Sequence, residues 1–242
     1  MQLTQNVYLV GSGEIGLSNP YDCHVYLVDG GSDAVLIDAG VGIEPELIKR
    51  NVQKFVDWHK VSRILCTHSH ADHSGGSEFF QNDGKEVWIS EIEADWMLNC
   101  KDDVEQALRL AKNAEAYPED YEFKYFTPDY VLTEHENIHC GSLTIQPILV
   151  RGHSPGMFCF YIQDEDKNIL FSGDSVFING HIGLLNAPGS ELHKYREDIG
   201  KLSELNVDAL FPGHRLFLLK NGQAHIQKAV DQLSKVFVPT TF

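Results

Sequence analysis

Residues 64–76 read Ile-Leu-Cys-Thr-His-Ser-His-Ala-Asp-His-Ser-Gly-Gly and hold three histidines and an aspartate within six positions. The apolar residues at the start of this segment predict a short buried strand that leads directly into the polar ones. In an extended backbone, residues two apart point the same way, so His68 and His70 can converge on one ion. Asp72 and His73 come just beyond them and can serve a second ion nearby.

These residue types suit a metal site. Imidazole nitrogen and carboxylate oxygen are ligands that Zn(II) accepts, and Fe(II) and Mn(II) tolerate the same set. The alternative interpretation is a solvent-exposed loop on which three neighbouring histidines bind no common ligand. The buried strand before the histidines and the pair Gly75-Gly76 after them indicate a tightly built turn instead. The segment therefore predicts a metal centre.

Strand patterns and helix patterns alternate around this segment. Short β-branched or aromatic runs predict strands over residues 6–10, 24–28, 34–38, 63–66, 86–89, 142–150, 158–163, 168–171 and 208–211. Helical spacing predicts helices over 44–58 and 226–233, and a further helix from a cap at Ser190. Pro147 places its strand at a sheet edge or interrupts it. The order of these elements predicts an α/β fold with two sheets that carry helices on their outer faces.

The segment at about residues 90–130 has a different character. Ser90-Glu91-Ile92-Glu93 has the pattern of a capping box, and two aspartates at 102–103 suit the start of a second helix. Six aromatic residues follow: Tyr117, Tyr121, Phe123, Tyr125, Phe126 and Tyr130. This helical and aromatic segment either packs over the core or forms a lid or a dimer surface near the site. No linker rich in proline, glycine or serine divides the chain, so residues 1–242 are expected to form a single domain.

Composition argues against several classes of protein. Of the 242 residues, 43% are hydrophobic and 22% are charged, which is ordinary for a soluble globular protein. The net charge of −16 disfavours binding to nucleic acid, because that binding depends largely on lysine and arginine. We expect no membrane span, no signal peptide and, from five scattered cysteines, no disulfide framework. The expectation is a cytoplasmic protein that acts on a small molecule and binds neither nucleic acid nor a membrane.

Four further motifs accompany residues 68–73. They are Asp38 in Leu36-Ile37-Asp38-Ala39-Gly40, His153 in Gly152-His153-Ser154-Pro155-Gly156, Asp174 in Ser172-Gly173-Asp174 and His214 in Phe211-Pro212-Gly213-His214. With the HxHxDH pattern of residues 68–73, they resemble the signature of the metallo-β-lactamase superfamily, in the family's order. The resemblance spans about residues 6–220, nearly the whole chain. It implies a four-layer αββα sandwich in which two mixed sheets are covered by outer helices.

The resemblance implies two metal sites that share one ligand. It assigns three residues to each ion and one to both: His68, His70 and His153 to the first, Asp72, His73 and His214 to the second, and Asp174 as the bridge. Zinc is the first expectation for both divalent ions, with iron or manganese as alternatives. Two such ions lower the pKa of a bridging water, so that hydroxide forms near neutral pH, and one of them polarises the substrate carbonyl.

The same resemblance implies roles beyond ligation. Asp72 and Asp174 are the expected catalytic residues, and Asp72 can take or hand on the proton as the leaving group departs. Asp38 is expected to fix a ligand histidine from behind rather than to touch a metal.

The substrate stays open among several branches of the family. Asp174 stands where true β-lactamases of this fold have cysteine or no bridging carboxylate, which argues against antibiotic hydrolysis. Ser175-Val176-Phe177 is similar to the run that follows this aspartate in the hydroxyacylglutathione hydrolases (glyoxalase II), but a later arginine and aspartate of those enzymes are missing here. Many acyl-homoserine lactonases have tyrosine where Phe177 stands. The expected reaction is therefore hydrolysis of an ester, a thioester or a lactone.

Two other functions are alternatives. A persulfide dioxygenase of the same fold would bind a single iron through His68, His153 and Asp174, and a non-catalytic module would bind metal without turnover. Metal analysis together with oxygen uptake would separate the first alternative from a hydrolase.

A few residues outside the motifs are candidates to meet the substrate. His24, Phe177 and His181 are positioned to line the pocket, although His24 is more typical of a core or edge histidine. For the assembly, a homodimer is one option, with the aromatic residues at 117–130 as its candidate surface.

Overall fold

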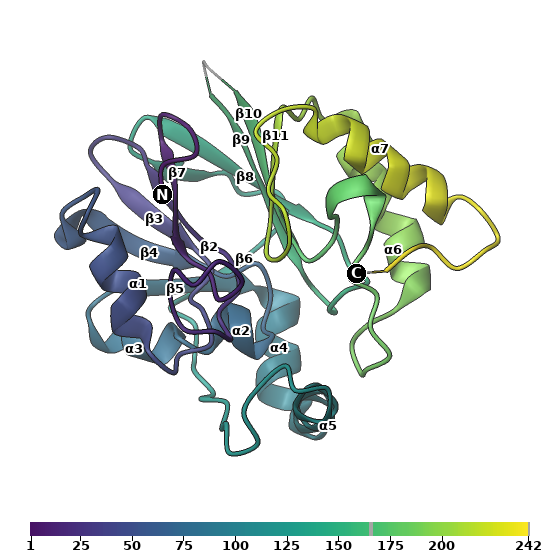
Figure 1. Cartoon of the computed structure of the whole chain (residues 1–242), viewed down its shortest axis with the longest axis horizontal. Coiled ribbons are helices and arrows are strands. Elements are labelled where there is room, and N and C mark those ends of the chain that lie inside the picture. Colours follow the sequence, from purple (N-terminus) through teal and green to yellow (C-terminus); the bar gives the residue numbers. More distant parts are fainter. Residues whose placement is uncertain (165–166, 242) are drawn as a thin grey trace.

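The computed structural model describes residues 1–164 and 167–241, which form two β-sheets with helices outside them (Figure 1). The first sheet has six strands in chain order: β1 (Val7–Gly11), β2 (Val25–Asp29), β3 (Ala34–Ile37), β4 (Val61–Leu65), β5 (Glu86–Ser90) and β6 (Tyr130–Leu132). Strands β1, β2 and β3 are antiparallel to one another, whereas β3 to β6 are parallel. This sheet is therefore mixed, as predicted.

The second sheet is also mixed. Its five strands lie in the order β11 (Ala209–Pro212), β10 (Asn168–Gly173), β9 (Phe158–Gln163), β8 (Leu143–Leu149) and β7 (Ile138–Cys140). Strands β10 and β11 are parallel, and the other neighbours are antiparallel.

Helices cover the outer faces of both sheets (Figure 1). On the first sheet lie α1 (Pro45–Val52), α3 (Ser77–Asn82) and α4 (Glu91–Asn99), and on the second lie α6 (Leu192–Asp198) and α7 (Gly222–Leu233). The shorter helices are α2 (Ala71–Ser74), η1 (Trp58–Lys60), η2 (Ile178–Gly180) and η3 (Ile199–Glu204). The four-layer α/β arrangement is thus confirmed. Across the described parts of the chain, none of these helices has the length and apolarity needed to span a membrane.

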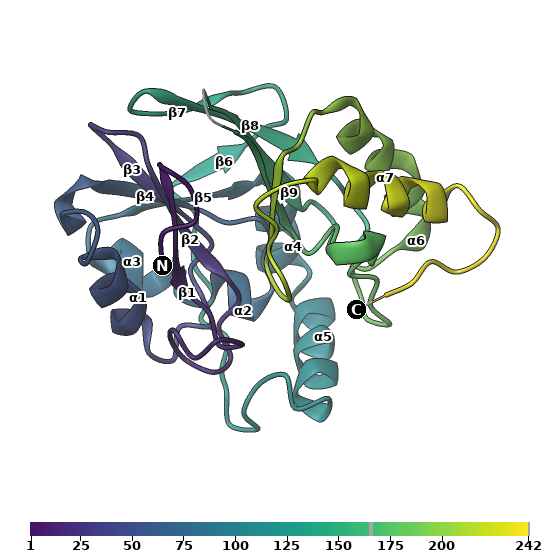
Figure 2. The ribbon, with the colours of Figure 1, turned by 45° about the horizontal axis from the view of Figure 1, so that its top comes forward.

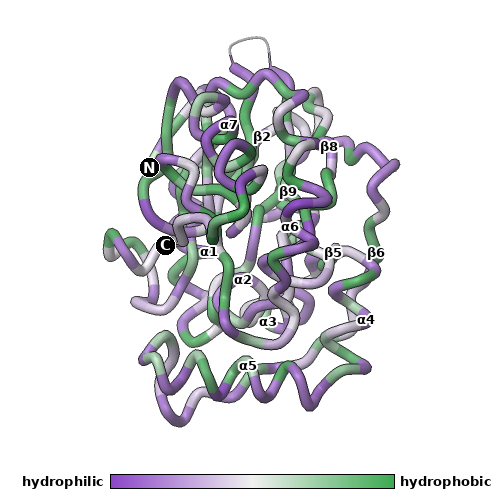
Figure 3. The backbone as a smooth tube through the Cα atoms, turned by 90° about the vertical axis from the view of Figure 1, so that its right-hand side faces the viewer, coloured by the Kyte–Doolittle hydropathy of each residue, from purple (hydrophilic) through white to green (hydrophobic). Residues whose placement is uncertain are grey.

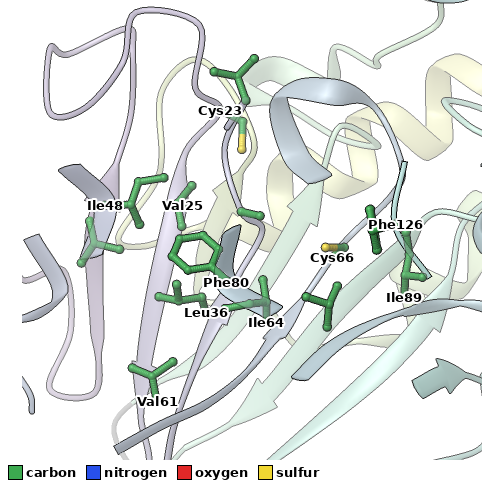
Figure 4. Close-up of a cluster of buried hydrophobic side chains, with 14 of the residues drawn as sticks. Cys23, Val25, Leu36, Ile48, Val61, Ile64, Cys66, Phe80, Ile89 and Phe126 are labelled. Atoms are coloured by element: carbon green, nitrogen blue, oxygen red, sulfur yellow. The ribbon is translucent and has the colours of Figure 1, made fainter. Parts of the chain in front are cut away.

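The alternation of side chains along the strands divides the apolar residues among three cores. In β3, Leu36 faces the outer helices and Ile37 faces the other sheet. In β10, Leu170 packs in the core that includes α6 and α7, and Phe171 packs between the sheets. Figure 4 shows the core outside the first sheet, where Phe80 of α3 lies beside the strand residues. The core between the sheets fixes how the strand ends of the two sheets meet.

Helix α5 (Lys101–Asn113) lies below the layered body in the view of Figure 2. Figure 3 shows hydrophobic and hydrophilic residues mixed along it at the edge of the molecule. Val104 and Leu108 are buried on one side, while Glu105 and Arg109 are exposed on the other. This is the pattern of an amphipathic helix, whose apolar face needs a neighbour.

One local expectation from the sequence holds only in part, and another is wrong. Strand β8 contains Pro147 and lies between β7 and β9, so the strand as a whole is not at an edge, although it has an open side at the proline. Because β7 pairs only with residues 143–145 of β8, the proline falls where β8 has lost that neighbour, and there it is tolerated. Ser190 caps no helix, since the cap residue of α6 is Glu191. The Ser190 hydroxyl instead donates to the carbonyl of Gly152 and accepts from the amide of Leu185.

The aromatic residues at 117–130 divide between core and surface. Tyr121, Phe123 and Phe126 are at most 9% exposed and belong to the core outside the first sheet. Figure 4 shows Phe126 close to Ile89 of β5. Tyr130 is half-exposed and begins β6, a strand of three residues that is too short to be recognised from its sequence. Much of this segment is therefore core.

Candidate metal centre

Every predicted site motif follows the end of a strand. Asp38 follows β3 and residues 68–73 follow β4, both in the first sheet. His153, Asp174 and His214 follow β8, β10 and β11 in the second sheet. The packing of the two sheets brings these loops together, and the seven predicted ligands form one cluster.

Three histidines form the first group of candidate ligands. His70 Nδ1 lies 3.0 Å from His68 Nε2 and 2.9 Å from His153 Nε2, and the latter two nitrogens are 3.2 Å apart. The other ring nitrogen of His153 donates to the carbonyl of Gly183, which leaves the lone pair of Nε2 for a metal. Three converging nitrogens of this kind are a donor set that a divalent ion can use.

Asp72, His73 and His214 form the second group. His214 Nε2 lies 2.9 Å from Asp72 Oδ2 and 3.3 Å from His73 Nε2. On the far side of the His73 ring, Nδ1 lies 2.8 Å from Asp38 Oδ2. Asp38 also accepts hydrogen bonds from the amide and hydroxyl of Thr67. This is the contact that the predicted supporting role of Asp38 requires.

Asp174 lies between the two groups. Its Oδ2 is 3.5 Å from His153 Nε2 and 3.5 Å from His214 Nε2, and its Oδ1 is 3.6 Å from His73 Nε2. Asp174 is 3% exposed, and its Oδ1 has no hydrogen-bond partner among the described residues. A buried carboxylate oxygen without a donor is costly unless a cation compensates it. The residues present therefore fit bound metal ions.

The protonation states also suit metal binding. Burial lowers the pKa of His70 to about 3 and that of His68 well below its usual range. Burial alone would raise the pKa of Asp174, but His214 and His73 hold it well below its usual range. At neutral pH the His68 and His70 imidazoles are therefore neutral and the Asp174 carboxylate is charged, and those are the forms that ligate metals. Burial alone would lower the pKa values of His73 and His214, but neighbouring acidic groups raise both above the usual range, so a metal ion would displace a proton from these two rings.

Gly213 explains why a glycine precedes the last histidine. A Cβ at this position would lie 2.5 Å from Asp174 Oδ1 and 2.5 Å from His73 Cε1. Any side chain there would clash with both Asp174 and His73, so the close approach of the backbone requires glycine.

A protein-family model described as the metallo-beta-lactamase superfamily matches residues 18–214 of this chain. The chain belongs to the metallo-β-lactamase superfamily.

Several relatives in this superfamily are named as thioesterases. The human acyl-coenzyme A thioesterase MBLAC2 is 29% identical over 232 residues, which cover 85% of this chain and 79% of that protein. The atrochrysone carboxyl ACP thioesterase of Aspergillus fumigatus is 22% identical over 232 residues, which cover 95% of this chain and 62% of that protein. The lactamase-like protein adaB of Aspergillus niger is 24% identical, with 56% of its length covered. This chain thus spans less than two thirds of the length of these fungal relatives.

Solved structures of the superfamily share the fold. The FEZ-1 metallo-β-lactamase from Legionella gormanii superposes with a TM-score of 0.72 at 18% identity, covering 96% of this chain and 93% of that one. A metallo-β-lactamase family protein from Thermus thermophilus also gives 0.72 at 20% identity, covering 95% and 80%. At such identities the likeness concerns the fold alone.

Glu93 supports the first group of this metallo-β-lactamase centre in a way the sequence did not reveal. Ser90 Oγ accepts from the Glu93 amide, so the serine half of the capping box is confirmed. The Glu93 carboxylate is fully buried and accepts hydrogen bonds from two other loops. Its Oε2 accepts from the amide and hydroxyl of Ser69, and its Oε1 accepts from the Ser154 hydroxyl and the Gly156 amide. Glu93 thus ties together the two loops that carry the three histidines. The S-x-x-E pattern indicates a helix start and gives no sign of this second use.

Tyr117 is a second residue that sequence analysis missed. Its hydroxyl donates to Asp72 Oδ1 over 2.6 Å, while Oδ2 of the same carboxylate faces His214. The only signal was its place among other aromatic residues, most of which are core. Tyr117 therefore links the segment after α5 to the second group.

Three further residues were predicted to line a substrate pocket: His24, Phe177 and His181. None of them lines the cavity beside the candidate metal ligands. His24 is buried, with Nε2 2.7 Å from the Arg215 carbonyl oxygen, so the core interpretation fits it better. Phe177 is buried, and its amide donates to the His181 carbonyl. The turn between them packs against α7, where the Asn179 amide donates to His225 Nδ1, and His181 is not among the residues that line the cavity.

A cavity of about 410 Å³ adjoins both groups of candidate ligands, a size typical of small-molecule sites. Residues of the metallo-β-lactamase motifs line one side of it: His70, Asp72, His153, Asp174 and His214. The other walls come from α4, α5, residues 116–123 and the loop at 185–187, and they are mostly apolar. Among the described residues, no lysine or arginine lines this cavity.

Proposed function

We propose that this protein is a dinuclear metal-dependent hydrolase of acyl thioesters. The observation that carries the proposal is the cavity, whose walls are apolar and whose lining includes ligands from both groups. A hydrocarbon acyl group matches such walls, and its carbonyl would then lie at the metal centre. The names of the human and Aspergillus fumigatus relatives support the choice of a thioester.

In this proposal the seven clustered residues hold two divalent ions, zinc in the first instance. His68, His70 and His153 would hold one ion, Asp72, His73 and His214 would hold the other, and Asp174 would serve both. Such ions, when bound, would lower the pKa of a bound water to supply hydroxide and would polarise the substrate carbonyl.

The chain's own residues orient the ligands and manage the proton. Tyr117 donates to Asp72 Oδ1, which leaves Oδ2 for the metal, and Asp38 holds His73 by Nδ1. Asp72 lines the cavity, which places its carboxylate beside the position where the leaving group would take up a proton. A thiol has a pKa of about 8.5. The thiolate leaving group of a thioester can therefore depart near neutral pH without a strong general acid.

The cavity disfavours a substrate whose charged groups must lie inside it. A β-lactam antibiotic carries a carboxylate next to the ring that is opened, and binding sites usually pair such a group with arginine or lysine, whereas the charged part of a coenzyme A or glutathione thioester would have to lie outside the cavity. Within the described parts of the chain, the cavity lining offers neither arginine nor lysine. Neutral acyl groups fit this lining better.

A substrate panel tests the proposal. We expect the zinc-loaded protein to hold two ions per chain. We also expect its kcat/KM for hydrolysis of octanoyl-coenzyme A to be higher than its kcat/KM for octanoyl-homoserine lactone or for lactoylglutathione. A preference for the lactone would make the protein a lactonase. One iron per chain with oxygen uptake on a persulfide would make it a dioxygenase, and metal binding without any turnover would leave a non-catalytic module.

A further inference from the structure

We infer that α5 is the wall along which the acyl chain lies, and that Ala107 and Ala111 set the length of chain that is accepted. The inference rests on the proposed thioester hydrolase and adds to it a specificity device. It concerns the part of the cavity that lies away from the metal ligands.

One face of α5 lines the cavity. Val104, Ala107, Leu108 and Ala111 all contribute to the lining. Their spacing of three, four and seven residues places them in one stripe along the helix. Residues 105, 106 and 109, on other faces of the helix, are exposed. The apolar face of this amphipathic helix therefore has the cavity as a neighbour.

Small side chains on α5 make the room. Val104 and Leu108 are buried, and Leu110 lines the cavity from a more exposed position, but Ala107 and Ala111, one turn apart on the same stripe, have side chains that end at Cβ. Leucine at either position would extend into the space and shorten the wall available to a ligand. The alanines at 114 and 116 continue this small lining toward Tyr117.

Lining residues from other elements are also apolar. Trp96 of α4 is 7% exposed, and its ring centroid lies 6.5 Å from that of His70 in an edge-to-face arrangement. Phe123 is 9% exposed, and Leu185 lies on the loop at 185–187. An aliphatic chain that enters from the metal ligands would thus meet apolar groups from α5 and from these residues. Each methylene group buried there contributes about fourfold to binding.

The experiment compares wild type with Ala107→Leu and Ala111→Leu. Hydrolysis of straight-chain coenzyme A thioesters from acetyl to palmitoyl gives kcat/KM against chain length, and calorimetric titration with the matching S-alkyl coenzyme A thioethers gives affinity without turnover. We expect both quantities to rise in wild type by about fourfold per methylene until the cavity is filled. In the leucine variants the rise should stop at shorter chains, with at least a tenfold loss for the longest chains and a loss that becomes smaller as the chain shortens.

Gln106→Leu is the matched control, because it adds leucine to an exposed position on another face of α5. It should keep the wild-type length profile. An equal loss at all lengths, or unchanged profiles in both alanine variants, would overturn the inference while thioester hydrolysis stands. If wild type hydrolyses no acyl thioester, the proposed function fails. The affinities for the thioethers would then still show whether Ala107 and Ala111 of α5 limit the length of chain that binds.

Discussion

At the scale of single residues, Glu93 shows how a buried charge can serve a metal centre without touching it. Its four acceptor contacts hold Ser69 on one loop and Ser154 and Gly156 on the other. Glu93→Gln replaces one acceptor oxygen by an NH₂ group that faces donors, so we expect a loss of about 1–3 kcal/mol in the free energy of unfolding. Zinc affinity at the first group should fall by about 10–100-fold, as measured by competition with a chelator.

Glu91→Gln is the control for this change, since Glu91 lies in the same first turn of α4 and is exposed. It should alter neither stability nor zinc affinity. Wild-type zinc affinity in the Glu93 variant would show that the two loops keep their positions without this carboxylate.

Tyr117 also supports a candidate ligand, because its hydroxyl donates to Asp72 Oδ1. Tyr117→Phe removes the donor to Asp72 Oδ1 and keeps the ring that lines the cavity. A hydrogen bond to a charged group contributes about 1.5–3 kcal/mol, so we expect kcat to fall by about tenfold or more, with the acyl length profile unchanged. Tyr125→Phe removes a comparable hydroxyl contact with Glu105 at an exposed position and should have no effect on kcat. An equal kcat in wild type and Tyr117→Phe would mean that Asp72 needs no such support.

At the scale of elements, some aromatic residues at 117–130 belong to the hydrophobic core and others line the cavity. Phe126 is 5% exposed, belongs to the core outside the first sheet and does not line the cavity. Phe126→Ala should therefore cost about 3–5 kcal/mol in denaturant unfolding and leave the substrate length profile of the folded protein unchanged. Phe237→Ala, at a position that is 77% exposed, should cost less than about 0.5 kcal/mol. A changed length profile with little loss of stability would instead place Phe126 in the acyl wall.

Elements with long, periodic patterns could be predicted from the sequence, and those defined by tertiary contacts could not. The strands β3 and β10 have continuous apolar runs, β4 ends in the short apolar run that precedes Thr67, and α7 has clear helical spacing, so each could be recognised. The strand β6 owes its existence to pairing with β5, and Ser190 bonds to Gly152 across the fold instead of capping the next helix. Such choices depend on neighbours that are distant in sequence.

At the scale of the whole molecule, the ligand cluster could be predicted because five motifs resemble the signature of the superfamily, and the structure places each of them at a strand end. The two sheets supply different members: residues 68–73 come from the first, and His153, Asp174 and His214 come from the second. The cavity could not be predicted, because its apolar wall is one face of α5 and its depth depends on where that helix lies. The local sequence of α5 shows only that one face is apolar.

Because the candidate ligands come from both sheets, bound ions should join the two halves of the fold. Ligand binding to the folded state alone adds about 4 kcal/mol when the free metal exceeds its Kd a thousandfold, and this corresponds to about 8–16 °C in Tm for a chain of this size. We therefore expect a chelator to lower Tm by at least this amount and added zinc to restore it, as followed by circular dichroism. Asp174→Ala removes the ligand shared by both groups, so its Tm should depend far less on zinc than that of wild type. If the Tm of wild type stays constant after elemental analysis shows that its ions are gone, then packing between the sheets holds the two halves together and the ions add nothing to it.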